Sequence, residues 1–354
     1  MLSSHTMGIQ MECSVYDSNG KLKLTRTTEP IIDNESNIEL TVKDQQSNLI
    51  DYKQIPIRSF VRNFEEIIRG ISEYNDYTQA IVRTTGSSYS ATPTCLNLKG
   101  WLGDDTYGVV VGSSSGSVLP TNYNLGLKIN NGTSNGELLY DYTMVNVPSS
   151  GSDYSSINIA RLFTNYGDDP VTINEVGLIS KYGTSYFLLA RDIVDASGSV
   201  INISVDKDYV FSVQYHIYAD VNTGITNNFM NALAVLFKNN GYDSNNYYPN
   251  PYDNVDSSGL NFMNDLSGDA IVYAPNVIWE TFLHSTYTPD NYSYGIVIGN
   301  DNTALDATLY SLQSKIDHGT GSGQMMYLVQ EFDPITVVGN RTQFTSKRAF
   351  INKS

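Results

Sequence analysis

Only four histidines are available for acid–base or metal chemistry, and their spacing favours neither. They are His5, His216, His284 and His318. None has a partner at the short intervals typical of zinc ligands. His216 lies in an alternating run typical of a strand, so we interpret it as an ordinary strand residue. The dipeptide Asp317–His318 lies in a glycine-rich turn, but a matching turn earlier in the chain carries Asn130 and Asn131 instead. The turn therefore does not require an ionisable pair.

Acidic residues suggest two calcium sites, and both patterns are incomplete. The run Asn300-Asp301-Asn302 together with Asp306 could offer oxygen ligands to Ca²⁺, yet an earlier copy of the segment has Ser114 and Leu119 at the positions of the two aspartates. We therefore favour a solvated loop there. The run Asp17-Ser18-Asn19-Gly20 resembles the start of an EF-hand loop but lacks the later ligands and the closing Glu. A hairpin turn is the better interpretation.

The chain carries no recognisable catalytic motif. GxSxG, GxxxxGK[ST] and HExxH do not occur. A glycosidase pair of carboxylates becomes a pair only in space, so the 37 acidic residues identify no candidate. Cys13 and Cys95 lie 82 positions apart; two ordinary thiols are favoured over a disulfide, which stays an open alternative. The sequence thus predicts a protein that is not an enzyme and needs no cofactor or metal.

Tyrosines form the clearest candidate contact residues. The segment 241–275 reads as a long loop rich in Asn, Tyr, Pro and Asp, and loops of this length are usually functional or mobile. Tyrosine rings there and further along could stack on sugars, or they could pack in loops and subunit contacts, which is the simpler interpretation. The candidate partner contacts are Tyr247, Tyr248, Tyr252, Tyr287 and Tyr292.

Composition excludes several other functions. The 354 residues carry a net charge of −16, with 16% charged residues, 26 Tyr and 35 Asn. The negative charge argues against specific nucleic-acid recognition, which needs Lys and Arg to displace counterions. No apolar run approaches the roughly 18 to 20 residues of a membrane-spanning helix, so we expect no membrane insertion. The first residues lack the basic start and apolar run of a secretory signal. Polar, Tyr-rich surfaces suit a protein that contacts other proteins.

An internal repeat organises the chain. Residues 107–140 and 294–327 align without gaps at an offset of 187, and 13 of 34 positions are identical. The same offset places Arg161, Phe163 and Asn165 on a second Arg, Phe and Asn. We therefore interpret the chain as two copies of one module.

Hydrophobic spacing predicts the elements around these copies. An amphipathic helix is expected over 57–71, capped by Ser59, and a second helix is expected from about 226 to 240. Short β-branched runs predict strands at 109–111, 171–179, 187–193, 209–218 and 296–298, with a bulge near Asn174. The first 50 residues predict two β-hairpins.

The predicted fold is mainly β, with two tandem β-sandwich-like modules, each preceded by an amphipathic helix. The expected domains are an N-terminal hairpin region over 1–50, a first module over 51–221 and a second module over 222–354 that contains the long loop. Counterparts of three strands of the first module do not follow Asn352, so the second module is predicted to be incomplete. We expect either a truncated or partly ordered form or strand addition from a neighbouring subunit.

Several motifs together carry a family resemblance. They are the two YG[VI]V[VI]G…Y.L..KI..G...G...Y segments, Arg161-x-Phe163-x-Asn165 leading into Ile173-Asn-Glu-Val-Gly-Leu178, and Arg58-Ser-Phe-Val-Arg-Asn-Phe64. In this combination the chain resembles a family of tailed-bacteriophage virion structural proteins, including proteins of crAss-like phages of gut Bacteroidales. The resemblance covers roughly residues 40–220 and part of 290–354. The family often has a single module, whereas this chain has two.

The resemblance implies a role rather than a reaction. It implies a ring or barrel subunit of the neck, collar or tail that surrounds the DNA path, with itself in a cyclic ring and other portal, neck or tail proteins as partners. The implied location is the virion, assembled in the bacterial host cytoplasm. It implies no catalytic residues. A receptor- or carbohydrate-binding tail protein is the main alternative, and a polysaccharide depolymerase the third.

Overall fold

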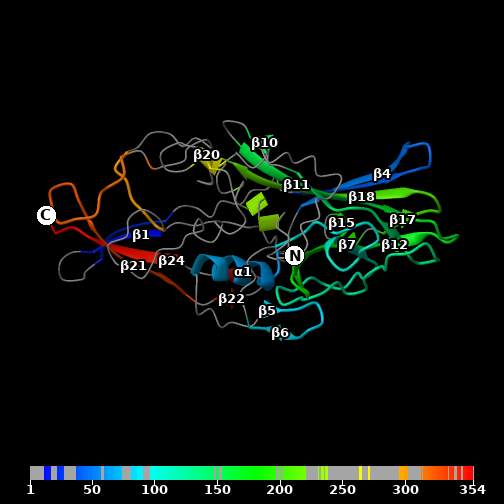
Figure 1. The fold of residues 1–354 in the computed structure, drawn as a ribbon, viewed down its shortest axis with the longest axis horizontal. Helices are drawn as coiled ribbons and strands as arrows, with labels where there is room; N and C mark the ends of the chain where they lie inside the picture. Colours follow the sequence, from blue (N-terminus) through cyan, green and yellow to red (C-terminus); the bar gives the residue numbers. More distant parts are fainter. Residues whose placement is uncertain are drawn as a thin grey trace.

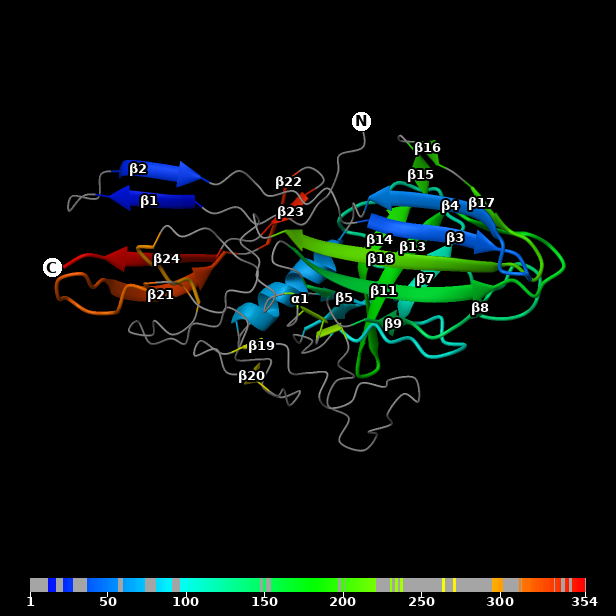
Figure 2. The same ribbon diagram turned by 90° about the horizontal axis from the view of Figure 1, so that it is seen from above.

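The fold is mainly β, as predicted from the sequence, and consists of several antiparallel sheets with little helix. It is seen in a computed structural model of the chain (Figures 1 and 2). The structure describes residues 12–16, 22–27, 37–56, 60–73, 81–90, 96–146, 149–150, 154–196, 199–200, 202–220, 230, 233–234, 236–237, 263–264, 270–271, 295–301, 312, 314–333, 335–338, 341–343 and 346–353.

A seven-stranded antiparallel sheet forms one layer of the first module. Its strands are β3 (Asn37–Lys43), β4 (Leu49–Pro56), β8 (Leu139–Tyr140), β9 (Met144–Val145), β10 (Ser149–Ser150), β11 (Tyr154–Thr164) and β18 (Val210–Asp220). The order is β10-β11-β18-β3-β4, and β8 and β9 also pair with β11. Alternate residues of β11 and β18 are buried, as the period-2 pattern of these strands requires. This alternation gives the sheet one apolar face.

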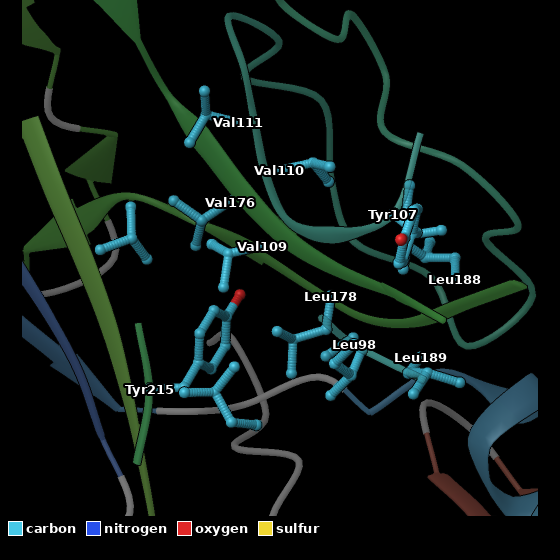
Figure 3. Close-up of a cluster of buried hydrophobic side chains, with 14 of the residues drawn as sticks. Leu98, Tyr107, Val109, Val110, Val111, Val176, Leu178, Leu188, Leu189 and Tyr215 are labelled. Atoms are coloured by element: carbon cyan, nitrogen blue, oxygen red, sulfur yellow. The ribbon is translucent and has the colours of Figure 1, made fainter. Parts of the chain in front are cut away.

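A smaller sheet packs against that face. It has the order β14-β13-β7, formed by β7 (Gly108–Gly112), β13 (Glu175–Tyr182) and β14 (Ser185–Ile193). Figure 3 shows Tyr215 of β18 pointing toward Val109 of β7 and Leu178 of β13, so the core lies between the two layers. Every residue of β7 is buried, because this short apolar strand is covered on both faces.

The first helix begins later than the sequence predicted. α1 spans Arg62–Glu73 rather than starting near residue 57. Phe60 forms a bridge with Ala190, and the Val61 amide donates to the Leu189 carbonyl oxygen at 2.8 Å. These residues extend the edge of β14, so the apolar pattern runs from a strand-like segment into the helix without a break.

The second predicted helix is helical where it is described. Its described residues are Met230, Leu233, Ala234, Leu236 and Phe237, which are all buried. The amides of Leu96 and Leu98 donate to the carbonyl oxygens of Leu236 and Phe237 at 3.0 and 2.9 Å. The segment 96–98 therefore joins this helix to the first module.

Four short antiparallel strand pairs accompany these sheets. They are formed by β5 (Ile81–Val82) with β6 (Ser88–Tyr89), β12 (Val171–Ile173) with β17 (Ile203–Val205), β15 (Asp195–Ala196) with β16 (Ser199–Val200), and β19 (Met263–Asn264) with β20 (Ala270–Ile271). Where the sequence predicted a bulge at Asn174, the structure has a break between two strands, since β12 ends at Ile173 and pairs with β17 whereas β13 begins at Glu175 and pairs with β7 and β14. Asn174 donates its amide to Gly112 and accepts the amide of Val194.

Two N-terminal hairpins are present, as predicted, but they belong to different sheets. β1 (Glu12–Tyr16) pairs only with β2 (Leu22–Thr27) among the described strands. β3 instead pairs with both β4 and β18. The seven-stranded sheet therefore begins at Asn37, and the expected domain boundary after residue 50 falls inside β4.

The second copy of the module contributes β21 (Met326–Phe332), β22 (Thr336–Val338), β23 (Arg341–Gln343) and β24 (Ser346–Ile351). β21 pairs with β24, and β22 with β23. Both views place β21 and β24 beside β1 at one end of the molecule, with the seven-stranded sheet toward the other end (Figures 1 and 2).

Candidate functional site

A buried arginine lies at the centre of the first module. Arg161 stands on the inward face of β11 and is fully buried. Its five N–H donors find five backbone carbonyl oxygens, those of Asp141 (2.6 Å), Tyr107 (3.0 Å), Val109 (3.0 Å), Trp101 (2.8 Å) and Asp104 (2.6 Å). Burial lowers the pKa of Arg161 to about 10, so it is still charged at neutral pH. The side chain thus ties β7 and the loop 101–106 to β11.

The ring of Tyr140 packs against the guanidinium group of Arg161. The Arg161 guanidinium carbon lies 4.8 Å from the Tyr140 ring centre, a cation–π contact. Tyr140 Oη donates to the Ile129 carbonyl oxygen at 2.6 Å, and the ring meets Phe163 edge-on at 4.7 Å. Burial raises the pKa of Tyr140, which keeps the hydroxyl protonated as a donor.

The second copy repeats this arrangement residue by residue at the offset of 187. The guanidinium carbon of Arg348 lies 5.0 Å from the centre of the Tyr327 ring. Tyr327 Oη donates to Ile316 O at 2.6 Å and its ring meets Phe350 edge-on at 4.9 Å. Arg348 donates to Leu328 O and Ile296 O, the counterparts of Asp141 and Val109. Even the strand register is kept, since β21 pairs with β24 as β8 and β9 pair with β11.

His318 has a structural role in this repeat. The Tyr140 amide donates to Asn131 Oδ1 at 3.0 Å, and the Tyr327 amide donates to His318 Nδ1 at 3.2 Å. An imidazole Nδ1 without a proton accepts a hydrogen bond as an amide oxygen does. This explains how the two copies can carry different residue types at one position.

A buried ion pair supports the loop that follows β7. Glu175 and Arg191, on neighbouring strands β13 and β14, form a salt bridge of 2.7 Å, and both are buried. Glu175 accepts the amides of Gly126 at 3.0 Å and Leu127 at 2.8 Å. The carboxylate thus binds the end of loop 113–127 as well as the arginine.

Arg191 binds the first half of the same loop. It donates to the carbonyl oxygens of Ser117 and Gly116, both at 3.1 Å, and to Asn122 Oδ1 at 3.0 Å. A charged pair that is fully hydrogen-bonded in this way holds a long irregular backbone in one conformation. The pair therefore holds the loop 113–127 in place.

These two arginines hold loops that display apolar side chains to solvent. We call residues 101–106 and 113–127 the display loops. Leu119, Tyr123 and Leu127 are 50%, 45% and 62% exposed, and Trp101 and Leu102 are also exposed. Apolar side chains on a rigid, exposed backbone are suited to binding another surface. The display loops are therefore the candidate functional site in the described part of the chain.

The sequence did not single out these loops. A signal was available, because Arg161 and Arg191 each interrupt an otherwise apolar strand run, and a lone cation in such a run must be paired when buried. The sequence does not show which residues pair with these two arginines, because the partners lie 16 to 75 positions away along the chain.

The residues predicted from the sequence as contacts cannot be compared with this site. Tyr247, Tyr248, Tyr252, Tyr287 and Tyr292 lie outside the described residues, as do Cys95, Asp306 and the turn 17–20. Among the residues that are described, no group of three His, Cys, Asp or Glu side chains could hold a metal ion. His216 is a strand residue whose Nδ1 lies 2.7 Å from Asn158 Oδ1 on β11.

Comparison with protein-family models, with curated proteins and with solved structures finds no match to this chain. No described helix has the length and apolarity to span a membrane.

Proposed function

We propose that this protein is a structural subunit of a tailed-bacteriophage particle, assembled with copies of itself into a cyclic ring at the neck, collar or tail. The observation that carries this proposal is the pair of display loops, which present Leu119, Tyr123 and Leu127 on a backbone held by buried arginines. The family resemblance of the repeated motifs supports the choice of particle.

The rigidity of the display loops suits permanent assembly. A surface loop that is already ordered loses little conformational entropy when it is buried, so more of its apolar contact remains as net affinity. Head-to-tail contacts between identical subunits close into rings when their rotation allows.

The net charge of −16 fits a position around the DNA path. Carboxylates facing the channel would repel DNA phosphates and let the genome slide rather than bind. On this proposal the partners are other portal, neck or tail proteins, the location is the virion, and no step of catalysis is required.

Removal of the apolar display tests the proposal. The double variant Leu119→Ser/Leu127→Ser should lose the ring seen by sedimentation velocity and negative-stain microscopy and should stay folded by circular dichroism. Leu49→Ser is the matched control, since Leu49 is 58% exposed but lies at the start of β4. Rings that persist in the double variant, or a wild-type chain that stays monomeric at virion-like concentrations, would contradict the proposal.

A second candidate function, a carbohydrate-binding tail protein, is favoured by one observation. The rings of Trp101 and Tyr142 lie 6.0 Å apart at an edge-on angle, and Trp101 is exposed. Exposed aromatic rings can stack on sugar rings. Binding on a glycan array that is lost in Trp101→Ala, together with a trimer in place of a ring, would favour this function over the first.

A further inference from the structure

In the first module, β7 has neighbours on both edges. Along one edge, Val109 O accepts from Arg161 and Val111 O accepts from the Ile129 amide. The other edge pairs with β13 in the register Glu175–Gly112, Gly177–Val110 and Ile179–Gly108. β7 is the end strand of its sheet, but both of its edges are occupied, one by β13 and the other by Arg161 and the segment 127–129.

The counterpart of β7 in the second copy is the segment Gly295–Gly299, and the described residues show partners on one of its edges. Ile296 O accepts from Arg348, and Ile298 O accepts from the Ile316 amide at 2.9 Å. Within the described part of the chain, no strand pairs with the opposite edge, which is formed by Gly295, Val297 and Gly299. Backbone groups without a described partner, on a segment that matches a strand in the first module, can accept an added strand.

The N-terminal hairpin has the geometry of the hairpin that covers β7. Counting from its first residue, β13 pairs with β14 through four consecutive pairs, and the register then shifts between Leu178 and Ile179. β1 pairs with β2 through four consecutive pairs starting at Glu12, and the register shifts between Val15 and Tyr16. The two hairpins thus carry the same irregularity at the same step.

The two edge-facing strands also share a residue pattern. β13 begins Glu-Val-Gly-Leu-Ile and β1 reads Glu-Cys-Ser-Val-Tyr, with a Glu first and a small residue third. In the first module, a Cβ on Gly112 would lie 2.5 Å from Glu175 Oε1, so the residue opposite this Glu must be glycine. The second copy keeps glycine there, at Gly299.

We infer that β1 of one subunit pairs, antiparallel, with the open edge of Gly295–Gly299 in a second copy of this chain. The register follows from β13: Glu12 opposite Gly299, Ser14 opposite Val297 and Tyr16 opposite Gly295. We assign the donor to a second copy because, among the described strands of one chain, β1 pairs only with β2 and not with this edge. Each subunit then gives a hairpin to one neighbour and receives one from the other, a head-to-tail contact that closes into a ring when the rotation between subunits allows.

This inference rests on the proposed self-assembly and adds its connecting strand, and a native cysteine provides the test. In this register Cys13 lies opposite Ile298, as Val176 lies opposite Val111 in a pair without mutual backbone hydrogen bonds. Such pairs bring Cα atoms to about 4.5 Å, within disulfide range. Ile298→Cys in a Cys95→Ser background should therefore give disulfide-linked multimers on mild oxidation of the assembled protein, resolved on a non-reducing gel.

Two controls match this variant. Moving the thiol by one position, with Cys13→Ser/Ser14→Cys beside Ile298→Cys, should abolish cross-linking, because neighbouring strand residues face opposite sides. Val297→Pro removes the edge N–H that a partner strand would use, so it should dissociate the assembly and leave the circular dichroism of the monomer unchanged.

The outcomes separate this inference from the proposed function. A disulfide within one chain, found by mass and peptide mapping, or equal cross-linking in both registers would overturn the inference. Rings could also form without a disulfide between Cys13 and the cysteine of Ile298→Cys, and remain assembled in Val297→Pro. That result would overturn the inference about β1 and leave the ring proposal in place. Absence of any multimer would overturn both.

Discussion

The guanidinium carbon of Arg161 lies 4.8 Å from the centre of the Tyr140 ring, and Arg348 lies 5.0 Å from Tyr327 in the same manner. In both copies the tyrosine hydroxyl donates to a carbonyl oxygen at 2.6 Å. A cation that binds neutral carbonyl groups rather than a carboxylate fixes the backbone around it. The repeat therefore conserves an anchor for loops and strands and not a reactive group.

Replacement of Arg161 by Lys should be severe. Lysine has three donors for five carbonyl oxygens, which leaves at least two buried acceptors unpaired at about 1–3 kcal/mol each. We expect the free energy of unfolding in urea to fall by about 2–6 kcal/mol. Arg348→Lys is the matched variant and should cost about 1 kcal/mol, because that site is partly exposed and water can replace the lost donors. Equal losses at the two sites would contradict this account.

The ion pair under loop 113–127 predicts a coupled pair of variants. Arg191→Met leaves the buried Glu175 carboxylate without its cation and should cost about 3–5 kcal/mol of stability. Adding Glu175→Gln to Arg191→Met should recover part of this loss, since no charge is then stranded. The amides of Gly126 and Leu127 donate to the Glu175 carboxylate. Their hydrogen exchange should therefore accelerate in the single variant and in the double variant. Additive losses with unchanged exchange would be the contrary result.

Two buried tyrosines should differ in how the free energy of unfolding responds to loss of their hydroxyl. Tyr140→Phe removes the bond to Ile129 O and should lower the free energy of unfolding by about 1–2 kcal/mol. Tyr215 Oη is buried and has no hydrogen-bond partner among the described residues. Tyr215→Phe should therefore leave stability unchanged or raise it by about 1 kcal/mol, measured by thermal and urea unfolding. A large loss in Tyr215→Phe would indicate a partner for that hydroxyl.

Buried tyrosines also predict how stability depends on alkaline pH. Burial raises the pKa of Tyr107, Tyr140 and Tyr215 above 10, so the folded chain keeps protons that the unfolded chain releases above that pH. Their contribution is complete below pH 10 and is lost as pH rises, by about 1.4 kcal/mol per pH unit for each proton. Arg161, with its pKa lowered to about 10, has the opposite sign and offsets one of the three.

The measurement is absorbance at 295 nm beside circular dichroism. Part of the tyrosinate signal should appear in one cooperative step together with loss of structure above pH 10, and Tyr215→Phe should make the loss less steep. Gradual ionisation of every tyrosine in an intact fold would contradict the prediction.

Much of the fold could be predicted from spacing alone. The β-branched run at 109–111 became β7, and the alternating run at 209–218 became β18, because period-2 burial is local information. The helix start was placed too early, because Phe60 and Val61 fit both the helical stripe and the edge of β14. Hydrophobicity alone does not distinguish these two uses.

The candidate site could not be predicted in the same way. The repeat pointed to Arg161 and Tyr140 as matched positions, but their contact depends on the pairing of β8 with β11. Glu175 and Arg191 meet across a hairpin, and their hold on loop 113–127 depends on where that loop folds back. Long-range contacts of this kind are set by the tertiary structure. Their only trace in the sequence is one charged residue within an apolar strand run, such as Arg161 or Arg191.

The order of the hairpin and its matching edge along the chain has a consequence for biosynthesis. β1–β2 ends at Thr27 and the matching edge begins at Gly295, so the donor leaves the ribosome about 270 residues before the acceptor. At about 5–20 residues per second this interval is roughly 13 to 54 s. An isolated two-stranded hairpin is only marginally stable during that time. During synthesis, the donor hairpin of a chain is therefore exposed long before the acceptor segment of the same chain exists. Because translation runs from the N-terminus, a subunit can bind the hairpin of a neighbour only after most of its own chain has been made.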